Sequence, residues 1–501
     1  MTDNSNLESA RAATLQRMMW FFAIVYIAEG WAQTSGIIKQ PLYHYLYGEM
    51  HWNADQVSFY MMLLGIPWWI KFLYGMLSDS CPLFGYRRKS YLVLTNLVAV
   101  VSYFALSRTS SPWPMLPSLM LIVASMAFAS ALCGALVVDM AKHAREPSYT
   151  LQKVIRSNVA TVGVAGTGGW LFQYFVPLDA LPNAATLILG GEMMGGLLVV
   201  SAGIAIGTAL YQRLHVDHSK HAPVASKFCG QQALWASMAS VVAAFFGGWL
   251  SQKYLPLEGL HMAALFAVGA PLLVTLVTWP LVTEEKAEPN KAHFREGLRA
   301  IKRAGQTKEL WAVAGFLALW AFNPAFSSVM YDHMSNHLHF SQMEIGQMNG
   351  YAGIGAACGA LLYMKVLSRL LSVRTLAVVI IVLGGATQMA FAFMVDPQTG
   401  MYLNLLNGCL TAMAGVNAHV IAANRCPDHA EGFMYSTLLS ISNLSWSTSD
   451  WLGGVVYTHV LHDQIFWLII ASAALTFGCL GVLRWLSVER PADEGSPQGV
   501  H

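Results

Sequence analysis

The sequence predicts an all-α protein that crosses a membrane many times. Hydrophobic residues make up 55% of the 501 residues, charged residues make up only 11%, and the mean hydropathy is +0.47. A soluble protein of this length needs more charge to cover its surface. The charges are clustered, and the tracts between the clusters reach the roughly 20 apolar residues that a helix needs to cross a bilayer. We therefore expect a bundle of transmembrane helices.

The apolar tracts define about fourteen spans, with both termini on one side of the membrane. Taking that side as the cytoplasm leaves only Lys39, Arg108 and Lys253, of the 29 Lys and Arg residues, in outer loops or at outer helix ends. The positive-inside rule favours this topology. In chain order the predicted spans are 17–39, 54–78, 89–108, 113–141, 152–176, 184–212, 229–251, 257–283, 309–332, 343–369, 373–395, 398–424, 431–459 and 463–487.

The most informative stretch joins the second and third spans, and contains KFLYGMLSD followed closely by GYRRK. Gly75 would let two helix ends approach closely. Asp79 can accept hydrogen bonds from a neighbouring helix N-terminus or from an arginine. Arg87 and Arg88 would hold the loop on the cytoplasmic side. We expect a latch between two helix bundles, and an ordinary basic loop is the alternative.

This stretch resembles the loop between helices 2 and 3 of the major facilitator superfamily. Residues 68–79, WWIKFLYGMLSD, resemble the W-x-I-K-P-x-Y-G-x-x-S-D signature of folate–biopterin transporters. FLALWAFNPAFSS at 316–328 is similar to helix 7 of that family. CPDHAEG at 426–432 and SISNL at 440–444 are similar to its entry into helix 11. Phe72 stands where the family usually has proline, so we expect a straighter helix there.

The resemblance implies a major facilitator fold of two six-helix bundles plus an inserted helix pair, because the family ordinarily has twelve helices. We expect the glycine-rich inserted pair to pack against the core; the alternative is a surface for self-association or for a partner. The implied organisation is helices 1–4 in residues 1–147, the inserted pair and a basic loop in 148–228, two helices in 229–283, a cytoplasmic linker in 284–308, a six-helix bundle in 309–488 and a disordered tail in 489–501.

The resemblance also implies secondary transport of a small organic solute by alternating access. Folate or a pterin would be the solute, and a proton is a candidate coupling ion. The alternative is a non-transporting factor for membrane assembly or pigment handling on the same fold. The N-terminus lacks transit-peptide character, since it carries Asp3 and Glu8 and few arginines. We therefore expect a plasma membrane or a bacterial inner membrane.

Charge inside the hydrocarbon region is costly, so each charged residue there is a functional candidate. Glu29 lies near the middle of the first span, one turn before Gln33, and Asp450 lies in the span 431–459. Both are candidates for carrying a proton or contacting substrate. Lys71 lies near the inner end of the second span. It would bind an anionic substrate or Asp79, unless it only reaches toward the lipid headgroups.

Aromatic rings and amides inside the bundle would suit the flat polar ring of a pterin. Polar residues in spans also hold helices together, and we expect that role for about half of them. The candidates are Asn323, Tyr331, Asn404, Asn407, Asn417, His419, Asn443 and Trp446.

Other classes of function have no support in the sequence. It contains no Walker loop, GxSxG, HExxH or GxGxxG motif, so we expect neither an enzyme nor a cofactor. His333, His337 and His339 follow Asp332, and surface histidines are a plainer reading than a metal site. The basic loops lack interleaved aromatic residues, so we expect no nucleic-acid binding.

Overall fold

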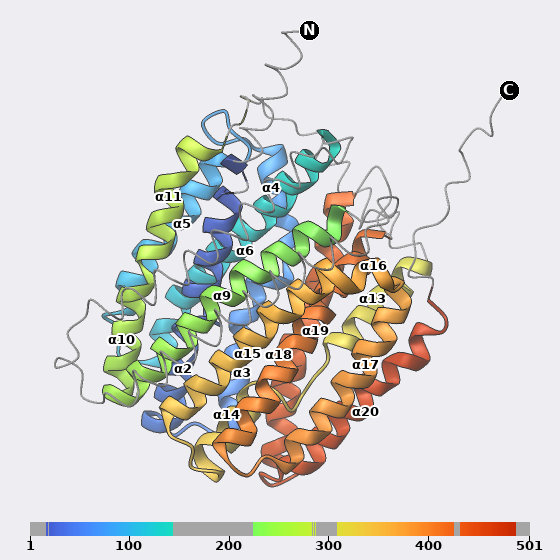
Figure 1. Cartoon of the computed structure of the whole chain (residues 1–501). Coiled ribbons are helices and arrows are strands. Elements are labelled where there is room, and N and C mark those ends of the chain that lie inside the picture. Colours follow the sequence, from blue (N-terminus) through green and yellow to red (C-terminus); the bar gives the residue numbers. More distant parts are fainter. Residues whose placement is uncertain are drawn as a thin grey trace, which may run out of the picture. The chain divides into compact units, whose positions relative to one another are not determined.

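The computed structural model describes residues 17–18, 20–143, 224–282, 284, 286, 308–424 and 431–486. These residues are helical apart from short connections (Figure 1). The described residues contain nine helical spans long and apolar enough to cross a membrane, some of them made of two consecutive helices, and Trp20–Ala32 and Leu310–Ala321 are shorter apolar helices. The predicted all-helical membrane class is therefore confirmed. The predicted spans 152–176 and 184–212 and the tail 489–501 lie outside the described residues.

Almost all described residues belong to one compact unit, residues 18–139 and 222–501. Its N-terminal half runs to Leu281 and its C-terminal half begins at Lys308. After the helix Trp20–Ala32, the N-terminal half contains α2 (Lys39–His44), the π-helix η1 (Tyr45–Glu49), α3 (Ala54–Trp69), α4 (Lys71–Ser80), α5 (Lys89–Leu106), α6 (Pro112–His143), α9 (Val224–Lys253), α10 (Pro256–Ala267) and α11 (Gly269–Leu281).

The C-terminal half repeats this pattern of long helices. It contains α13 (Lys308–Ala321), α14 (Ser328–Asp332), the π-helix η3 (His333–His337), α15 (Gln342–Leu362), the π-helix η4 (Tyr363–Leu367), α16 (Ser368–Leu370), α17 (Val373–Ala390), the 3-10 helix η5 (Phe391–Phe393), α18 (Pro397–Asn424), α19 (Glu431–His459) and α20 (Ile465–Leu483).

The helix bundle has two ends, each of which takes its name from one residue. The Tyr47 end carries η1, η3 and the first residues of α3 and α15. The Arg88 end carries the loop between α4 and α5. Helices α3 and α4 run from the Tyr47 end to the Arg88 end.

The first helix of each half is broken, whereas the sequence predicted continuous spans at 17–39 and 309–332. In the N-terminal half the helix ends at Ala32, bend and turn residues cover 33–38, and α2 begins at Lys39. The Ile37 N–H donates to the Trp31 carbonyl, six residues earlier, at 2.9 Å, whereas an α-helix joins residues four apart. Gly36 packs directly on that carbonyl, where a Cβ would clash. The continuous-span prediction was therefore wrong here.

The break in the C-terminal half has a visible cause. Helix α13 ends at Ala321, and α14 begins only at Ser328. Pro324 lacks an N–H, and its ring disfavours helical backbone at Asn323. Ser327 has a φ of 153°, outside any helix. Hydropathy alone does not detect such a break, because the residues on both sides of it are apolar.

The second helix is also interrupted. Helix α3 contains Pro67 and ends at Trp69, and Ile70 has φ −98° and ψ 15° before α4 begins. A proline inside a helix removes one hydrogen bond and clashes with the preceding turn. Pro67 lies five residues before Phe72, and whether Phe72 makes this helix straighter than that of its relatives stays a prediction.

Close packing between the halves uses small residues. Gly248 of α9 lies against Gly346 of α15, where an added Cβ would come within 2.8 Å of the Gly346 Cα. Helix α3 meets α19 where Gly454 lies against Ser58. Along this pair, the Trp69 indole N–H donates to Ser447 Oγ at 3.2 Å. Small residues let helix backbones approach closely, so α9 packs tightly on α15 and α3 packs tightly on α19.

Candidate functional site

Charged groups converge on Lys71, the first residue of α4 after the break at Ile70. The Lys71 ammonium donates to Ser130 Oγ of α6 at 2.9 Å and lies 5.1 Å from the centre of the Trp68 ring. It attracts Glu29 of the first helix, and it lies within electrostatic range of His419 of α18 in the other half. An acid, a base and an imidazole from three helices therefore share one interior region. The Asp79 side chain, its other predicted partner, lies outside the described part of the chain.

Two shielded oxygens near the helix breaks accept no hydrogen bond from the described residues. They are Glu29 Oε2, one turn before the first break, and Asn323 Oδ1, inside the second break. Buried polar atoms are nearly always paired in folded proteins, so each exception requires an explanation. A bound solute with N–H or O–H groups would supply the missing donors.

At the Tyr47 end, Asp450 of α19 holds the start of α14. Its Oδ1 accepts the Ser328 N–H at 3.0 Å, and its Oδ2 accepts the Ser328 hydroxyl at 2.7 Å. Asp450 is 5% exposed. Lys39 of α2, in the other half, attracts it electrostatically. The sequence identified Asp450 as a candidate, but it placed Lys39 at an outer helix end.

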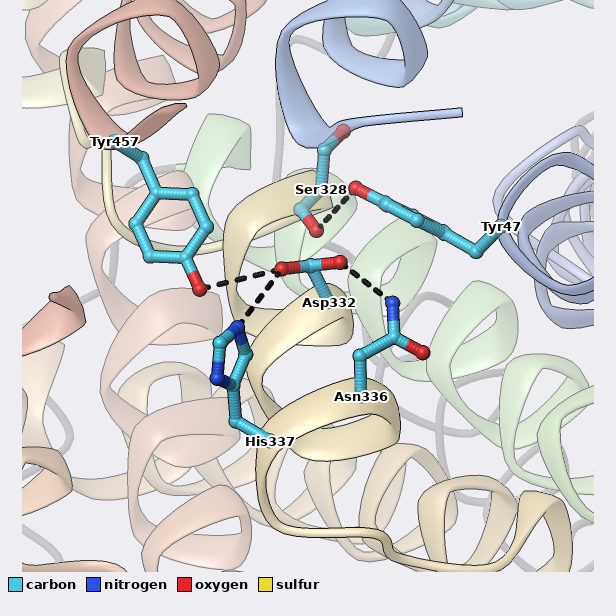
Figure 2. Close-up of polar contacts among 6 residues, drawn as sticks. All are labelled: Tyr47, Ser328, Asp332, Asn336, His337 and Tyr457. Atoms are coloured by element: carbon cyan, nitrogen blue, oxygen red, sulfur yellow. Dashed lines mark hydrogen bonds and ion pairs between the residues drawn. The ribbon is translucent and has the colours of Figure 1, made fainter. Parts of the chain in front are cut away.

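Tyrosines from both halves stack beside Ser328. Tyr331 lies 5.0 Å from Tyr43 and 5.5 Å from Tyr47, measured between ring centres. The Tyr47 hydroxyl donates to the Ser328 carbonyl at 2.9 Å, as Figure 2 shows. The Tyr331 hydroxyl donates to Gln342 Oε1 at 2.7 Å. This tyrosine cluster (Tyr43, Tyr47, Tyr331) joins the two halves at the Tyr47 end. The sequence flagged Tyr331 and missed the other two, although their spacing of four residues places them on one helix face.

Asp332 forms a separate polar cluster within the C-terminal half (Figure 2). Its carboxylate accepts from Asn336 Nδ2 at 2.7 Å and from the Tyr457 hydroxyl at 3.2 Å, and it lies 3.7 Å from His337 Nε2. The His333 and His337 rings stack at 5.7 Å, and burial lowers the pKa of His333 to about 4. Among the described residues, no group of three His, Cys, Asp or Glu side chains could hold a metal ion.

The remaining predicted residues have different surroundings. Asn417 is fully buried and holds helices together, since its Oδ1 accepts from the Tyr363 hydroxyl at 2.7 Å. Gln33 lies in the first helix break, where its carbonyl accepts the Gly36 N–H at 2.7 Å. Asn407 and Asn443 are half-buried on α18 and α19. Trp446 of α19 is 49% exposed.

The loop at the Arg88 end is fixed by a residue that the sequence did not single out. The Glu284 carboxylate accepts the backbone N–H groups of Arg87, Arg88 and Lys89 at 3.0–3.2 Å. A carboxylate at this place caps the N-terminus of α5. The Lys89 ammonium lies 4.4 Å from the Trp279 ring of α11. In this conformation Glu284 therefore ties the loop to the end of α11, within the N-terminal half.

Gly75 does not make the close approach that the sequence suggested. A Cβ at Gly75 would meet no atom of the described residues within 4 Å. The glycine that the loop requires is Gly85, with a φ of +82°, in the tight turn between Leu83 and Tyr86. Only glycine adopts that backbone conformation without strain.

A family model fits most of the chain. The model of the BT1 family matches residues 31–176 and 193–496. The chain belongs to the BT1 family. Residues 177–192, which the match leaves out, fall within the predicted inserted pair. The prediction of that insertion is not tested by the described residues.

Curated relatives in this family carry transporter names. The chain is 22% identical to the folate-biopterin transporter of Synechocystis over 92% of its own length and 80% of the relative. It is also 22% identical to the probable folate-biopterin transporter 2 of Arabidopsis thaliana, over 79% of this chain and 67% of the relative. The predicted family is thereby confirmed. Its named relatives are transporters rather than enzymes.

Solved structures establish the fold. The D-xylose-proton symporter aligns with a TM-score of 0.57 at 9% identity, covering 95% of this chain and 98% of that one. The nucleoside transporter NupG aligns with a TM-score of 0.54 at 12% identity, covering 94% of this chain and 99% of that one. The BT1-family chain is an integral, multi-pass membrane transporter with the major facilitator fold.

Proposed function

We propose that this BT1-family protein is a proton-driven symporter of a folate-like or pterin-like solute and works by alternating access. The observation that carries the proposal is the paired break in the first helix of each half, with Glu29 and Asn323 beside the breaks. Broken helices whose free polar groups face the interior are the usual way in which transporters build a binding site. The names of the relatives favour the solute class.

The interior polar groups suit such a solute. Lys71 would attract an anionic tail, the His419 imidazole would offer it a hydrogen bond, and Glu29 would accept N–H groups from a heterocyclic ring. Gln33 and Asn323 would add hydrogen bonds from the two breaks, and Asn407, Asn443 and Trp446 would line the path on α18 and α19. Asn417 is assigned a structural role, because its amide already joins two helices.

The orientation follows the distribution of basic residues. We assign the Tyr47 end to the outside and the Arg88 end to the cytoplasm, with both termini cytoplasmic. The hydrogen bonds from Tyr47 and Gln40 to the C-terminal half then make this an outward-closed state. A plasma membrane or a bacterial inner membrane remains the assigned location.

Uptake into proteoliposomes tests the proposal directly. Purified protein is expected to accumulate labelled folate or labelled biopterin when the outside is acidic, and to stop accumulating either when the proton gradient is collapsed. Liposomes without protein are the control. If correctly inserted protein takes up neither compound, the solute assignment is wrong, and a membrane assembly factor becomes the better hypothesis.

The loop at the Arg88 end is proposed as an inner latch, in which Asp79 with Arg87 and Arg88 stabilises the outward-facing state. The Asp79→Asn substitution is expected to weaken the latch and lower uptake while leaving membrane insertion intact. Asp79→Glu, which keeps the carboxylate, is the matched control. Unchanged uptake kinetics for Asp79→Asn would remove the latch role.

A further inference from the structure

We infer that Asp450 is the binding site for the coupling proton, and that its charge keeps the Tyr47 end closed. The inference rests on the proposed proton-driven transport and identifies the residue that couples the two processes.

The first step is the position of Asp450 at the start of α14. Both of its carboxylate oxygens accept from Ser328, one from the N–H and one from the hydroxyl. An ionised carboxylate can accept both bonds at full strength, whereas a protonated one has lost part of its accepting capacity. Protonation of Asp450 therefore weakens the hold on α14.

The second step is that Ser328 is also where the N-terminal half attaches. The Tyr47 hydroxyl donates to the Ser328 carbonyl at 2.9 Å, and the Tyr43 hydroxyl lies 3.2 Å from Ser328 Oγ. One residue is thus held by a carboxylate of its own half and by two tyrosines of the other half. A shift of α14 disturbs both tyrosine contacts together.

The third step is the charge that faces Asp450 from the other half. Lys39 and Tyr43 lie on α2, and Tyr47 lies on η1; all three interact with Asp450 electrostatically. Tyrosine hydroxyls are neutral at physiological pH, so Lys39 carries the only positive charge among these three. Protonation of Asp450 abolishes its attraction for Lys39 and removes one link between the halves.

These contacts determine which state of the protein binds the proton more tightly. Lys39 and Ser328 stabilise ionised Asp450 when the Tyr47 end is closed, and they separate from it or shift when that end opens. Asp450 therefore binds a proton more tightly in the open state than in the closed state. By linkage, a bound proton favours opening by the same free energy.

Asp332 offers a matched control, because it is also a buried carboxylate near the Tyr47 end. It is 8% exposed, and its partners Asn336, His337 and Tyr457 all belong to the C-terminal half (Figure 2). Its charge also acts electrostatically on Tyr47 of the other half, but the charge that acts on Lys39 is that of Asp450. Removing the Asp332 charge therefore leaves both the hold on Ser328 and the attraction to Lys39 in place. We expect Asp332→Asn to preserve coupling.

Transport by proteoliposomes separates coupling from movement. Asp450→Asn is expected to lose accumulation driven by a proton gradient, while it still exchanges labelled for unlabelled solute at a measurable rate. Asp332→Asn should retain both activities. Gradient-driven accumulation by Asp450→Asn would overturn the inference. The inference would also be overturned if Asp332→Asn, and not Asp450→Asn, lost gradient-driven accumulation.

A second readout does not depend on the solute. Spin labels at exposed Ser110 and Gln398, one near the Tyr47 end of each half, report the opening of that end. In wild-type background their separation should lengthen as the pH falls from about 8 to about 5, because the ionised fraction of a carboxyl decreases. In Asp450→Asn the longer separation should persist at both pH values. A pH response unchanged in Asp450→Asn overturns the inference, even if the transported solute has been assigned wrongly.

Discussion

Replacing Lys71 with glutamine is expected to abolish uptake and to lower the unfolding temperature of the protein in detergent. Replacing Glu29 with glutamine should have the same two effects. The double variant Glu29→Gln/Lys71→Gln is expected to recover stability without recovering uptake. The stability of the double variant, compared with that of each single variant, separates the structural and transport roles of the two groups.

The physical reason is the cost of an unpaired charge. Glu29 and Lys71 attract one another inside the bundle. Removing one of two interacting charges in the bundle leaves the other with less compensation, whereas removing both leaves neutral groups of similar shape. Uptake does not recover in the double variant, because the solute would still lack its anion-binding ammonium and its accepting carboxylate.

Purified variants in detergent and in proteoliposomes provide the measurement. Ser130→Ala is the matched control, since it removes the hydroxyl that accepts from Lys71 at 2.9 Å and leaves both charges in place. It should reduce uptake far less than Lys71→Gln. Normal uptake by Lys71→Gln would exclude this region as the solute site. If the double variant is less stable than either single variant, an uncompensated charge does not explain the loss of stability in the single variants.

The helical class and most span positions could be predicted from the sequence, because apolar length and charge asymmetry are local properties. The breaks at 33–38 and 322–327 were missed, since a hydropathy window averages over a few irregular residues. Pro324 was a usable signal for the second break. The run QTSG at 33–36 was a usable signal for the first break, where the carbonyl of Trp31 accepts the N–H of Ile37.

The candidate site could be predicted only as separate residues. Glu29, Lys71 and Asp450 were found because charge is rare in spans, but their partners depend on contacts between distant helices. The electrostatic effect of Lys39 on Asp450 joins α2 of one half to α19 of the other, which the sequence does not show. A basic residue near the end of a span is otherwise typical of the membrane surface. Glu284 was missed for a related reason, because it lies beside a basic segment and the N–H groups that donate to it belong to a distant loop.

Gly355→Ala is expected to destabilise the C-terminal half by about 1–3 kcal/mol, the usual cost of overfilling a packed core. Gly355 of α15 faces the Leu405 carbonyl of α18 so closely that a Cβ would clash with it, and Gly359 faces Cys409 in the same way. The clashing atoms belong to the backbone, so no side chain can rotate away. The two helices would have to separate along their shared face.

Gly384→Ala in α17 is the matched control for this substitution. Its added methyl group would meet none of the described atoms within 4 Å. Alanine is favoured over glycine inside a helix by about 1 kcal/mol, so this variant should be unchanged or slightly more stable. Unfolding temperature in detergent and the monodisperse fraction after purification measure both variants. Equal stability of Gly355→Ala and Gly384→Ala would show that α15 and α18 are less closely packed than the glycine contacts indicate.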